Sequence, residues 1–459
     1  MQPRRNGPPR LTRGPRRRDI APVPSTSIVY RAAVRVGTAL APALALGNRK
    51  VGEGHRRRLG AAARLVAWAA ARRDRARPLV WFHAASVGEG LQAESVLLEL
   101  RRLLPDCQVV YTHFSPSAEA LAHRLPVDAA EYLPYDLPDS AERLLGALAP
   151  DLLVFAKLDL WPELSTRAAA RGVVVALVAA TVSAGSGRLR WPARPLLRAG
   201  YAAVGAAGAV SEADAARLAL LGVPAQRIRV LGDPRFDSVA ARVASVAPDD
   251  PLLGLGRGAP TMVAGSTWPA DEVVLLRAFA GLRERRPDAR LIVVPHEPTV
   301  SHLAALERRA ARAGLPQPLR LSEAAGPVPL LVVDRVGALA AIYGGAVVAY
   351  VGGGFGRAGL HSVLEPAAWG VPVVFGPGWR NSRDAALLLD GGAAAALESR
   401  SPRAAGKLLL GYWEGWLADE PRRLAAGGRA REIVREGTGA ARRSAGMLAA
   451  LISSRLPRT

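Results

Sequence analysis

Short apolar runs alternate with segments of helical spacing along most of the chain, and this alternation predicts an α/β fold. The first clear run is Leu79–Ala85, with the sequence LVWFHAA. Runs of this length with little polar interruption are typical of strands that are buried on both faces of a parallel sheet. The later runs are Val109–Thr112, Leu152–Ala156, Val173–Val178, Ala206–Val210, Met262–Ala264, Leu291–Val294, Leu330–Val333, Ala346–Val351 and Val371–Gly376.

The stretch after the run Ala346–Val351 carries the densest candidate chemistry. Three consecutive glycines, Gly352–Gly354, break the predicted strand, and a short helical segment opens near His361–Glu365. Glycines let the backbone approach a phosphate closely, and a helix N-terminus offers free N–H groups. This order of elements predicts a nucleotide pocket, with phosphate on the glycines and ribose on Glu365. The alternative is a glycine-rich turn that carries a surface glutamate.

The length of 459 residues predicts more than one domain. Two series of strands and helices are separated by an Ala/Pro/Asp/Gly-rich segment at residues 241–260, which we interpret as a linker. The predicted domains are therefore 78–245 and 255–422, and the helical segment 423–459 could cross back onto the first. The single cysteine, Cys107, excludes an internal disulfide and fits a reducing compartment.

The basic charge of the chain is concentrated at its N-terminus. Residues 1–77 hold 19 Lys and Arg against three acids, which is +16 of the net +22. Residues 1–26 are rich in Pro and Arg and lack periodicity, so they predict a disordered tail. Segment 27–77 is predicted to be helical and membrane-associated, but Arg31 and Arg35 lie inside its apolar stretch. Because each arginine is costly at the bilayer centre, a helix on the membrane surface is favoured over a spanning one; a plain amphipathic core helix is the alternative.

Two groups of charged residues follow predicted strands in the first half. Glu89 comes shortly after the first strand, and Lys157 and Asp159 follow the strand Leu152–Ala156. Ligands bind beyond the carboxyl ends of parallel strands, so these side chains are expected at one cleft. Alternatively, Glu89 is an acid in a helix first turn, and Lys157 and Asp159 form a solvated pair.

Seven motifs, in order along residues 28–440, give the chain a resemblance to a known family, the 3-deoxy-D-manno-octulosonic acid (Kdo) transferases of lipopolysaccharide biosynthesis. They are HAASVGE (His83–Glu89), LPYDLP (Leu133–Pro138), KLDLWP (Lys157–Pro162), GDPRFD (Gly232–Asp237), GSTWPADE (Gly265–Glu272), VPHEP (Val294–Pro298) and VGGGFG with HSVLEPAAWGVPVVFGP (Val351–Pro377).

The resemblance implies a GT-B architecture, with two Rossmann-like domains that face a central cleft and an N-terminal membrane-associated helix. It implies an acceptor domain at 78–245, a CMP-Kdo domain at 255–422, and an inverting transfer of Kdo from CMP-Kdo to a lipid A precursor at the cytoplasmic face of the inner membrane. Glu89 falls on the family's catalytic base, and Lys157 and Arg235 on positions that support the transition state. Implied substrate-binding residues are Ser266, Thr267, Pro295, His296, Val336, Gly337, Ala338, Gly353, Gly354, His361, Ser362, Val363, Leu364 and Glu365.

Three positions depart from the pattern that this resemblance implies. Many members have Glu at Lys157, Arg-His at His296-Glu297, and Asn at Ser362. These changes leave the expected reaction class intact and place the individual roles of the three residues in doubt.

No cofactor or metal is expected. The sequence shows no Asp-x-Asp pair near the nucleotide stretch, and its seven histidines lack metal-ligand spacing. The expected partners are CMP-Kdo, a lipid A precursor and an anionic membrane surface that contacts the basic N-terminus, without nucleic acid. Two other functions stay open. One is a GT-B transferase that uses a UDP-sugar, although Val373 stands where such enzymes often have a second glutamate. The other is a non-enzymatic basic scaffold.

Overall fold

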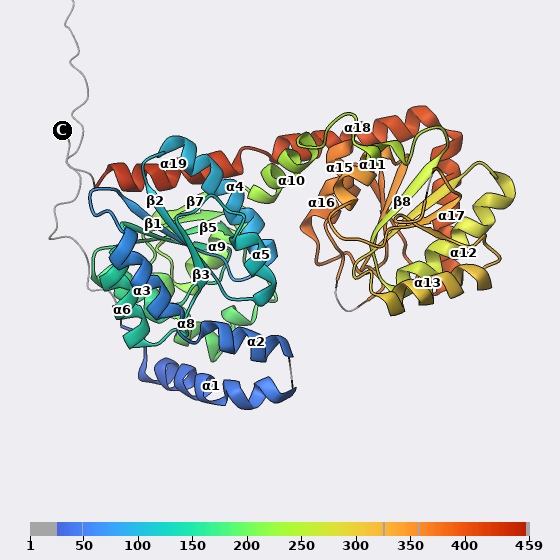
Figure 1. Ribbon diagram of the computed structural model, residues 1–459. Helices are drawn as coiled ribbons and strands as arrows, with labels where there is room; N and C mark the ends of the chain where they lie inside the picture. The colour runs from blue at the N-terminus through green and yellow to red at the C-terminus, as the bar shows by residue number, and fades with distance from the viewer. Residues whose placement is uncertain (1–24, 48, 325, 357–358, 456–459) are drawn as a thin grey trace, which may run out of the picture. The chain divides into compact units, whose positions relative to one another are not determined.

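The chain folds into two compact units, each built around its own parallel sheet. The computed structural model describes residues 25–47, 49–324, 326–356 and 359–455. Unit 1 comprises the chain up to Gly232 together with the segment from Arg442 onward, and unit 2 comprises Asp233–Ala441. Figure 1 shows one sheet with its covering helices in each unit.

The sheet of unit 1 has seven parallel strands in the order β3-β2-β1-β4-β5-β6-β7. Strand order reverses at β1 and β4, which is the switch point of a Rossmann-like sheet. The strands are β1 (Leu79–His83), β2 (Gln108–His113), β3 (Ala129–Tyr132), β4 (Leu152–Ala156), β5 (Val174–Ala180), β6 (Ala206–Ala209) and β7 (Ile228–Val230).

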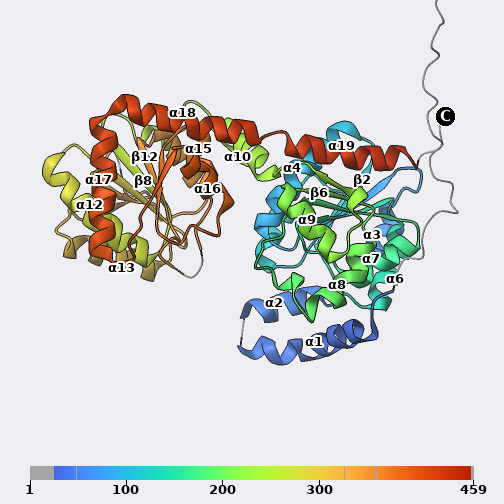
Figure 2. The same ribbon diagram turned by 180° about the vertical axis from the view of Figure 1, so that it is seen from behind.

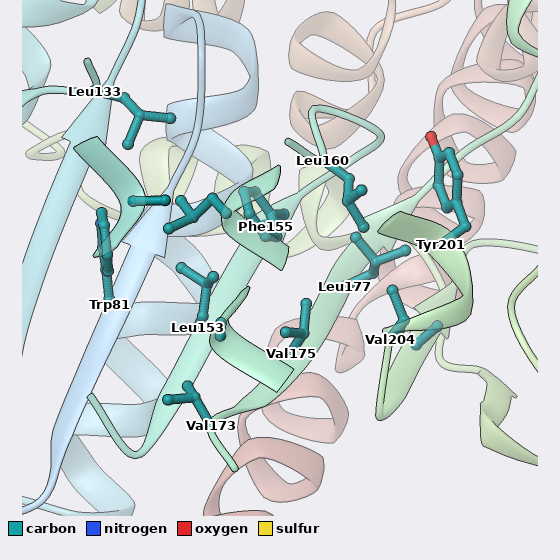
Figure 3. Packing of buried hydrophobic residues seen from close by; sticks show 14 of the residues in the cluster. Trp81, Leu133, Leu153, Phe155, Leu160, Val173, Val175, Leu177, Tyr201 and Val204 are labelled. Carbon is teal, nitrogen blue, oxygen red and sulfur yellow. The ribbon is translucent and has the colours of Figure 1, made fainter. Parts of the chain in front are cut away.

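Helices cover this sheet and bury alternate strand residues in an apolar core. Trp81, Leu153, Phe155, Val175 and Leu177 all face this core, as Figure 3 shows. Because strand side chains alternate between faces, residues two apart share one core. The helices of this part of the chain are α3 (Ala61–Arg72), α4 (Val87–Leu103), α5 (Glu119–Ala122), α6 (Pro138–Leu148), α7 (Pro162–Ala170), α8 (Ala193–Ala202), α9 (Glu212–Leu221) and α19 (Ala440–Ser453), with 3₁₀ turns at Pro116–Ala118, Gly187–Leu189 and Ala225–Arg227.

The first helix, α1 (Ile28–Gly47), packs beside α2 (Arg49–Arg58) and turns its apolar residues to solvent. Its exposed residues are Ile28, Val29, Val36, Leu40, Leu44 and Leu46. Polar groups attach it to unit 1 instead. Tyr30 donates to Asp136 over 2.7 Å, and Arg31 donates to Glu163 over 3.0 Å. Within the described residues, no helix is both long and apolar enough to cross a membrane.

The predicted disordered tail, 1–26, lies outside the described residues up to position 24. The structure differs from that prediction at Thr26, which is buried and whose hydroxyl donates to Glu163. A buried carboxylate is costly unless it accepts hydrogen bonds, so the bond from Thr26 to Glu163 holds the chain in place just before α1.

The sheet of unit 2 also has seven parallel strands, in the order β10-β11-β9-β8-β12-β13-β14. They are β8 (Thr261–Thr267), β9 (Arg290–Pro295), β10 (Leu319–Arg320), β11 (Leu330–Val332), β12 (Val348–Val351), β13 (Val373–Phe375) and β14 (Ala394–Ala396). The alternation along these strands is strict. Met262 and Ala264 face one core, whereas Val263 faces the other.

Helices cover both faces of this second sheet. One core receives α12 (Pro269–Arg285), α13 (Val300–Arg312) and α17 (Pro402–Ala418). The opposite core receives α10 (Pro234–Ala244), α14 (Leu339–Ile342), α15 (Leu364–Trp369), α16 (Arg383–Asp390) and α18 (Glu420–Gly437). Helix α11 (Pro251–Gly254) and a 3₁₀ turn at Tyr343–Gly345 complete the unit. Figure 2 shows α12, α13 and α17 together on one side of the sheet.

The chain divides earlier than the predicted domain boundary at 245. Helix α10 belongs to unit 2, because Phe236 and Val239 are buried in that unit's core. The predicted linker at 241–260 likewise holds the end of α10 and all of α11. At the other end of the chain, the contacts assign α18 to unit 2 and residues from Arg442 onward to unit 1.

Candidate active site

In unit 1, the strands that carry the predicted catalytic residues are neighbours. Residue pairing of β1 with β4 places His83 beside Phe155 at their carboxyl ends. Glu89 follows β1 through a short turn, and Lys157 follows β4 directly. The structure therefore places both residues at the switch point of the first sheet, where ligands of open α/β sheets bind.

Glu89 is half-buried in the first turn of α4 and forms a capping box with Ser86. Its Oε2 accepts from the Ser86 backbone N–H over 3.1 Å and from the Ser86 hydroxyl over 3.0 Å. These bonds fix the carboxylate at the helix N-terminus, and its other oxygen, Oε1, stays available. The helix-capping alternative for Glu89 is thus present in the structure, and it leaves one oxygen that can accept a proton.

Lys157 is exposed and adopts a left-handed backbone conformation, with φ of 61°. It does not pair with Asp159. Instead, Asp159 lies 3.1 Å from Nε2 of His83, and the Trp161 indole N–H donates to it over 3.3 Å. Burial alone would raise the pKa of Asp159, but these contacts with His83 and Trp161 bring that pKa below its usual value. His83 is fully buried, and its contact with Asp159 joins the end of β1 to the loop that carries Lys157.

In unit 2, the glycine stretch packs so closely against its neighbours that side chains are excluded. A Cβ on Gly352 would lie 2.3 Å from the Ser266 carbonyl oxygen, and one on Gly354 would lie 2.7 Å from the backbone of Gly376. Gly353 has φ of 95°, which favours glycine. Ser266 itself sits in a strand irregularity with φ of 53°. Bulges of this kind re-aim side chains next to functional sites.

A buried carboxylate that the sequence reasoning did not select, Asp271, holds this loop in place. It accepts from the backbone N–H of Gly353 over 3.0 Å, from that of Trp268 over 2.9 Å, and from the Tyr350 hydroxyl over 2.8 Å. Burial raises the pKa of Asp271 in spite of these bonds. Because the Gly353 N–H already donates to Asp271, it is not free for a phosphate, which corrects the expectation that the whole glycine run binds one.

Three aromatic rings gather at the carboxyl ends of β8, β9 and β12. His296 and His361 stack with their ring centroids 4.3 Å apart and their planes 24° apart. Trp268 lies 5.0 Å from His296, and its indole N–H donates to Nε2 of His361 over 2.9 Å. Burial, followed by the neighbouring His296, lowers the pKa of His361 to about 4. We call Trp268, His296 and His361 the ring cluster. Because its pKa is about 4, His361 is neutral near pH 7.

The start of α15 adds further donors. The backbone N–H groups of Ser362 to Glu365 donate to no acceptor among the described residues. Ser362 is exposed, whereas Val363 and Leu364 are buried. The free donors beside the loop are therefore these amides.

Two predicted site residues are engaged in ion pairs within unit 2. Glu365 accepts from Arg242 of α10, which is a different environment from the free ribose acceptor that the sequence predicts. Arg235 donates to Asp233 over 2.6 Å and to Asp384 over 2.8 Å. Burial opposes the charge of Arg235, but the two carboxylates raise its pKa. Its charge is thus balanced by this pair, which links α10 to α16.

The remaining predicted residues lie along the same edge of the second sheet. Thr267 is buried, and its carbonyl accepts from the His296 N–H over 3.0 Å. Pro295 ends β9. The turn Val336–Ala338 follows β11, two strands from β8, with Val336 largely exposed and Ala338 buried. Ser266 and Thr267 at the end of β8 lie next to Pro295 and His296 at the end of β9. The 336–338 turn lies at the same edge of the sheet, but it follows β11, which is two strands from β8.

Two residues near the glycine loop escaped the sequence reasoning although their motif had been noticed. Trp268 and Asp271 both lie in the GSTWPADE motif, from which only Ser266 and Thr267 were selected. The signal for Asp271 is the capping position three residues after Trp268. Arg242 and Asp384 carried no signal, because their partners are 123 and 149 residues away. Within the residues that the structure describes, no three His, Cys, Asp or Glu side chains form a metal-binding group.

Comparisons with known proteins agree with this arrangement. A family model described as 3-deoxy-D-manno-octulosonic-acid transferase (kdotransferase) matches residues 54–238. The 3-deoxy-D-manno-octulosonic acid transferase of Bordetella pertussis is 32% identical over 379 residues, which is 80% of this chain and 85% of that protein. The chain belongs to the Kdo transferase family.

Further matches extend this result. The transferase of the same name from Haemophilus influenzae is 26% identical over 65% of this chain and 70% of that protein. Among solved structures, a UDP-N-acetylglucosamine 2-epimerase from Listeria monocytogenes, described as putative in its title, superposes with a TM-score of 0.58 over 82% of this chain and 96% of that one, at 12% identity. At that identity the likeness shows the fold alone. This Kdo transferase family member thus has the two-sheet α/β GT-B fold of a glycosyltransferase.

Proposed function

We propose that this glycosyltransferase moves Kdo from CMP-Kdo to a lipid A precursor in lipopolysaccharide biosynthesis. The observation that carries the proposal is the match to the Bordetella pertussis transferase over 80% of the chain. The seven motifs, spread over both units, support it.

The proposed reaction forms one bond and breaks another at the anomeric carbon of Kdo. A hydroxyl oxygen of the acceptor attacks that carbon while Glu89 removes its proton. The bond to the phosphate oxygen breaks on the opposite face, so CMP leaves and the configuration inverts. A carboxylate suits this role because it is ionised near neutral pH and only needs hydrogen-bond reach to the acceptor. The transition state is expected to have oxocarbenium character.

The donor is assigned to unit 2, where the ring cluster and the α15 amides supply uncharged donors. The amides of Ser362 to Glu365 suit a phosphate, since backbone N–H groups at a helix start bind anions. Val336–Ala338, His296 and Glu365 are proposed to contact the nucleotide. Gly354 keeps the loop thin beside them. Oriented donors of this kind stabilise developing charge without having to reorganise during the reaction.

Lys157 is the proposed free cation of unit 1. Its side chain is exposed directly after β4, one of the two strands at the switch point of the first sheet. Among the described residues, no carboxylate forms an ion pair with it. Arg235 has a less direct role in this proposal, because Asp233 and Asp384 already take up its charge. We assign Arg235 to positioning α10 and α16, and Lys157 to offsetting negative charge that develops during the reaction.

Helix α1 is the proposed contact with the membrane of the cell, which we take to be the inner membrane at its cytoplasmic face. Its apolar side chains face solvent, with Leu46 92% exposed and Ile28 82% exposed. Exposing such a row to water is unfavourable, whereas a helix with one apolar face gains energy at a bilayer surface. The exposed arginines Arg56 and Arg57 of α2 would attract anionic lipids.

The test is Glu89→Gln, assayed with CMP-Kdo and a lipid A precursor. Glutamine can still accept from Ser86 and keep the capping box, so the fold is preserved while the base is lost. Turnover should fall by about a hundredfold or more, since positioned general bases contribute roughly that much. Glu99→Gln is the matched control, because Glu99 lies on the same helix and pairs with the exposed Arg102.

Retention of most turnover in Glu89→Gln, with an unchanged melting temperature, would remove Glu89 as the base. Donor choice is tested separately by offering UDP-sugars to the wild-type protein. Transfer from a UDP-sugar but not from CMP-Kdo would refute the donor assignment while leaving the base assignment open.

A further inference from the structure

A large groove lies on unit 2, between the edge strand β14 and the helices α17 and α18. We call it the β14 groove. Its volume is about 1140 Å³, which is ample for a drug-sized or lipid-sized ligand. None of the residues 352–365 lines it, so it is separate from the candidate donor site. Figure 2 shows α17 running directly into α18.

The floor of the groove is apolar and made of small residues. Ala394–Ala396 form the outer edge of the sheet, since β14 pairs only with β13. Gly411 and Gly415 lie one turn apart on α17, and a Cβ on either would meet nothing within 4 Å. These two glycines therefore leave open space on the side of α17 that faces the groove.

Aromatic side chains stand along the walls. The rings of Tyr412 and Trp416 lie 6.1 Å apart on α17, and Trp379 lines the groove after β13. Tyrosine and tryptophan combine a large apolar ring with a polar tip, and they are enriched where an apolar region meets water. Leu408, which is 41% exposed, extends this wall.

The rim carries four cations, Arg380, Lys407, Arg422 and Arg429, against the single carboxylate of Glu398. No described carboxylate forms an ion pair with any of the four. Arg429 donates to the Gly392 carbonyl, and Arg380 lies 5.3 Å from the Trp379 ring. The rim therefore keeps an excess of positive charge that an anionic group could neutralise.

From the apolar floor, the aromatic walls and the unpaired cationic rim, we infer that the β14 groove binds an anionic amphiphile, a lipid molecule with a phosphate headgroup. The acyl portion lies over Gly411 and Gly415, and the headgroup lies at Lys407 and Arg422. Free inorganic phosphate would leave the apolar floor uncovered. An acidic peptide that added a strand to β14 would gain few backbone bonds, because β14 is only three residues long.

The experiment measures binding of a short-chain phosphatidylglycerol, kept below its micelle concentration, to the full-length protein by calorimetry. Gly411→Leu should fill the groove without a clash. Gly428→Leu is the matched control, because Gly428 is also an exposed helical glycine with open space around it but does not line the groove. Affinity should fall by about tenfold or more in Gly411→Leu, corresponding to about 1.4 kcal/mol, and stay at the wild-type value in Gly428→Leu.

The charge is tested in a second pair of variants. Lys407→Gln/Arg422→Gln should weaken binding by about tenfold or more, whereas Arg403→Gln, an exposed change on α17 outside the groove, should not. Phosphatidylcholine with the same chains should bind more weakly than phosphatidylglycerol. Wild-type affinity in Gly411→Leu, or equal affinity for the two lipids, would overturn the inference.

Two soluble probes test whether the groove binds free phosphate or an acidic peptide in place of a lipid. Inorganic phosphate that displaced the lipid at equal concentration would reduce the site to a phosphate site. A polyglutamate peptide that bound as tightly as the lipid and lost affinity in Gly411→Leu would assign the groove to a peptide. Because these readouts are binding alone, they are independent of transfer from CMP-Kdo.

Discussion

The hydrogen bond from Trp268 to His361 fixes the protonation of that histidine. An indole N–H can only donate, so Nε2 of His361 must present its lone pair, and the proton of the neutral ring is on Nδ1. Protonation of Nε2 would break this bond. The bond therefore adds to burial and to the neighbouring His296, which already lower the pKa of His361 to about 4. The variant Trp268→Phe keeps a ring in the cluster and removes only the donor.

The size of the effect follows from the bond. A neutral hydrogen bond contributes about 1 kcal/mol net. One pKa unit corresponds to about 1.4 kcal/mol, so loss of the bond should raise the pKa of His361 by roughly 0.5–1 unit. The rise stays modest because Trp268→Phe leaves both burial and His296 in place.

The assay is NMR of histidine-labelled protein, in which the ring C–H of His361 is followed through a pH titration. His361→Gln identifies the signal among the seven histidines. Trp379→Phe is the control, because Trp379 lies in the same unit outside the ring cluster and should leave the titration unchanged. An unchanged or lowered pKa in Trp268→Phe, or an Nε2-protonated tautomer in the wild type, would refute the reasoning.

Two further predictions concern buried charges. Burial raises the pKa of Asp136 from 3.8 to about 6. Because the folded state binds this proton more tightly, its stabilising contribution is present below about pH 4 and is lost as pH rises through about 6, in total by about 3 kcal/mol. Urea unfolding across this range should show the slope in the wild type and lose it in Asp136→Asn; equal slopes would contradict the prediction. Arg235→Ala should lower the free energy of unfolding by about 1–3 kcal/mol, because it removes the arginine that pairs with the buried carboxylates of Asp233 and Asp384. The loss stays at the low end for a buried pair because the Arg235 side chain is itself 39% exposed. Addition of Asp384→Asn should restore part of that loss, and unchanged unfolding in Arg235→Ala would contradict the positioning role of this arginine.

Much of the fold could be predicted from the apolar runs, because parallel strands buried on both faces leave a strong local signal. The run Leu152–Ala156 coincides with β4, and the other runs lie within a few residues of the observed strands. The strands that were not predicted are short or rich in alanine, such as Ala129–Tyr132 and Ala394–Ala396. Alanine favours helices, so these residues form strands only because a neighbouring strand pairs with them.

The candidate site was harder to predict, because its important contacts join distant parts of the sequence. The sequence shows that Glu89 opens a helix and that Gly352–Gly354 follow a strand. It does not show that Asp271 binds the backbone of Gly353, or that Arg242 meets Glu365 across 123 residues. The assignment of α10 to unit 2 was missed for the same reason, since the core that buries Phe236 is built from residues later in the chain.

The pairing of these charges changes which groups can hold an anionic donor. From the charges of the side chains alone, one would expect Arg235 to bind a phosphate and Glu365 to lack an ion-pair partner. In the structure both are neutralised by partners within unit 2, and Asp271 is committed to the backbone of the loop. Among the described residues at this edge, the α15 amides and the neutral His361 keep N–H groups that suit an anion, and we propose that these groups hold the donor. In this arrangement the paired carboxylates hold α10, α15, α16 and the glycine loop in place, and under the function proposed above the recognition of the donor would fall to uncharged N–H groups.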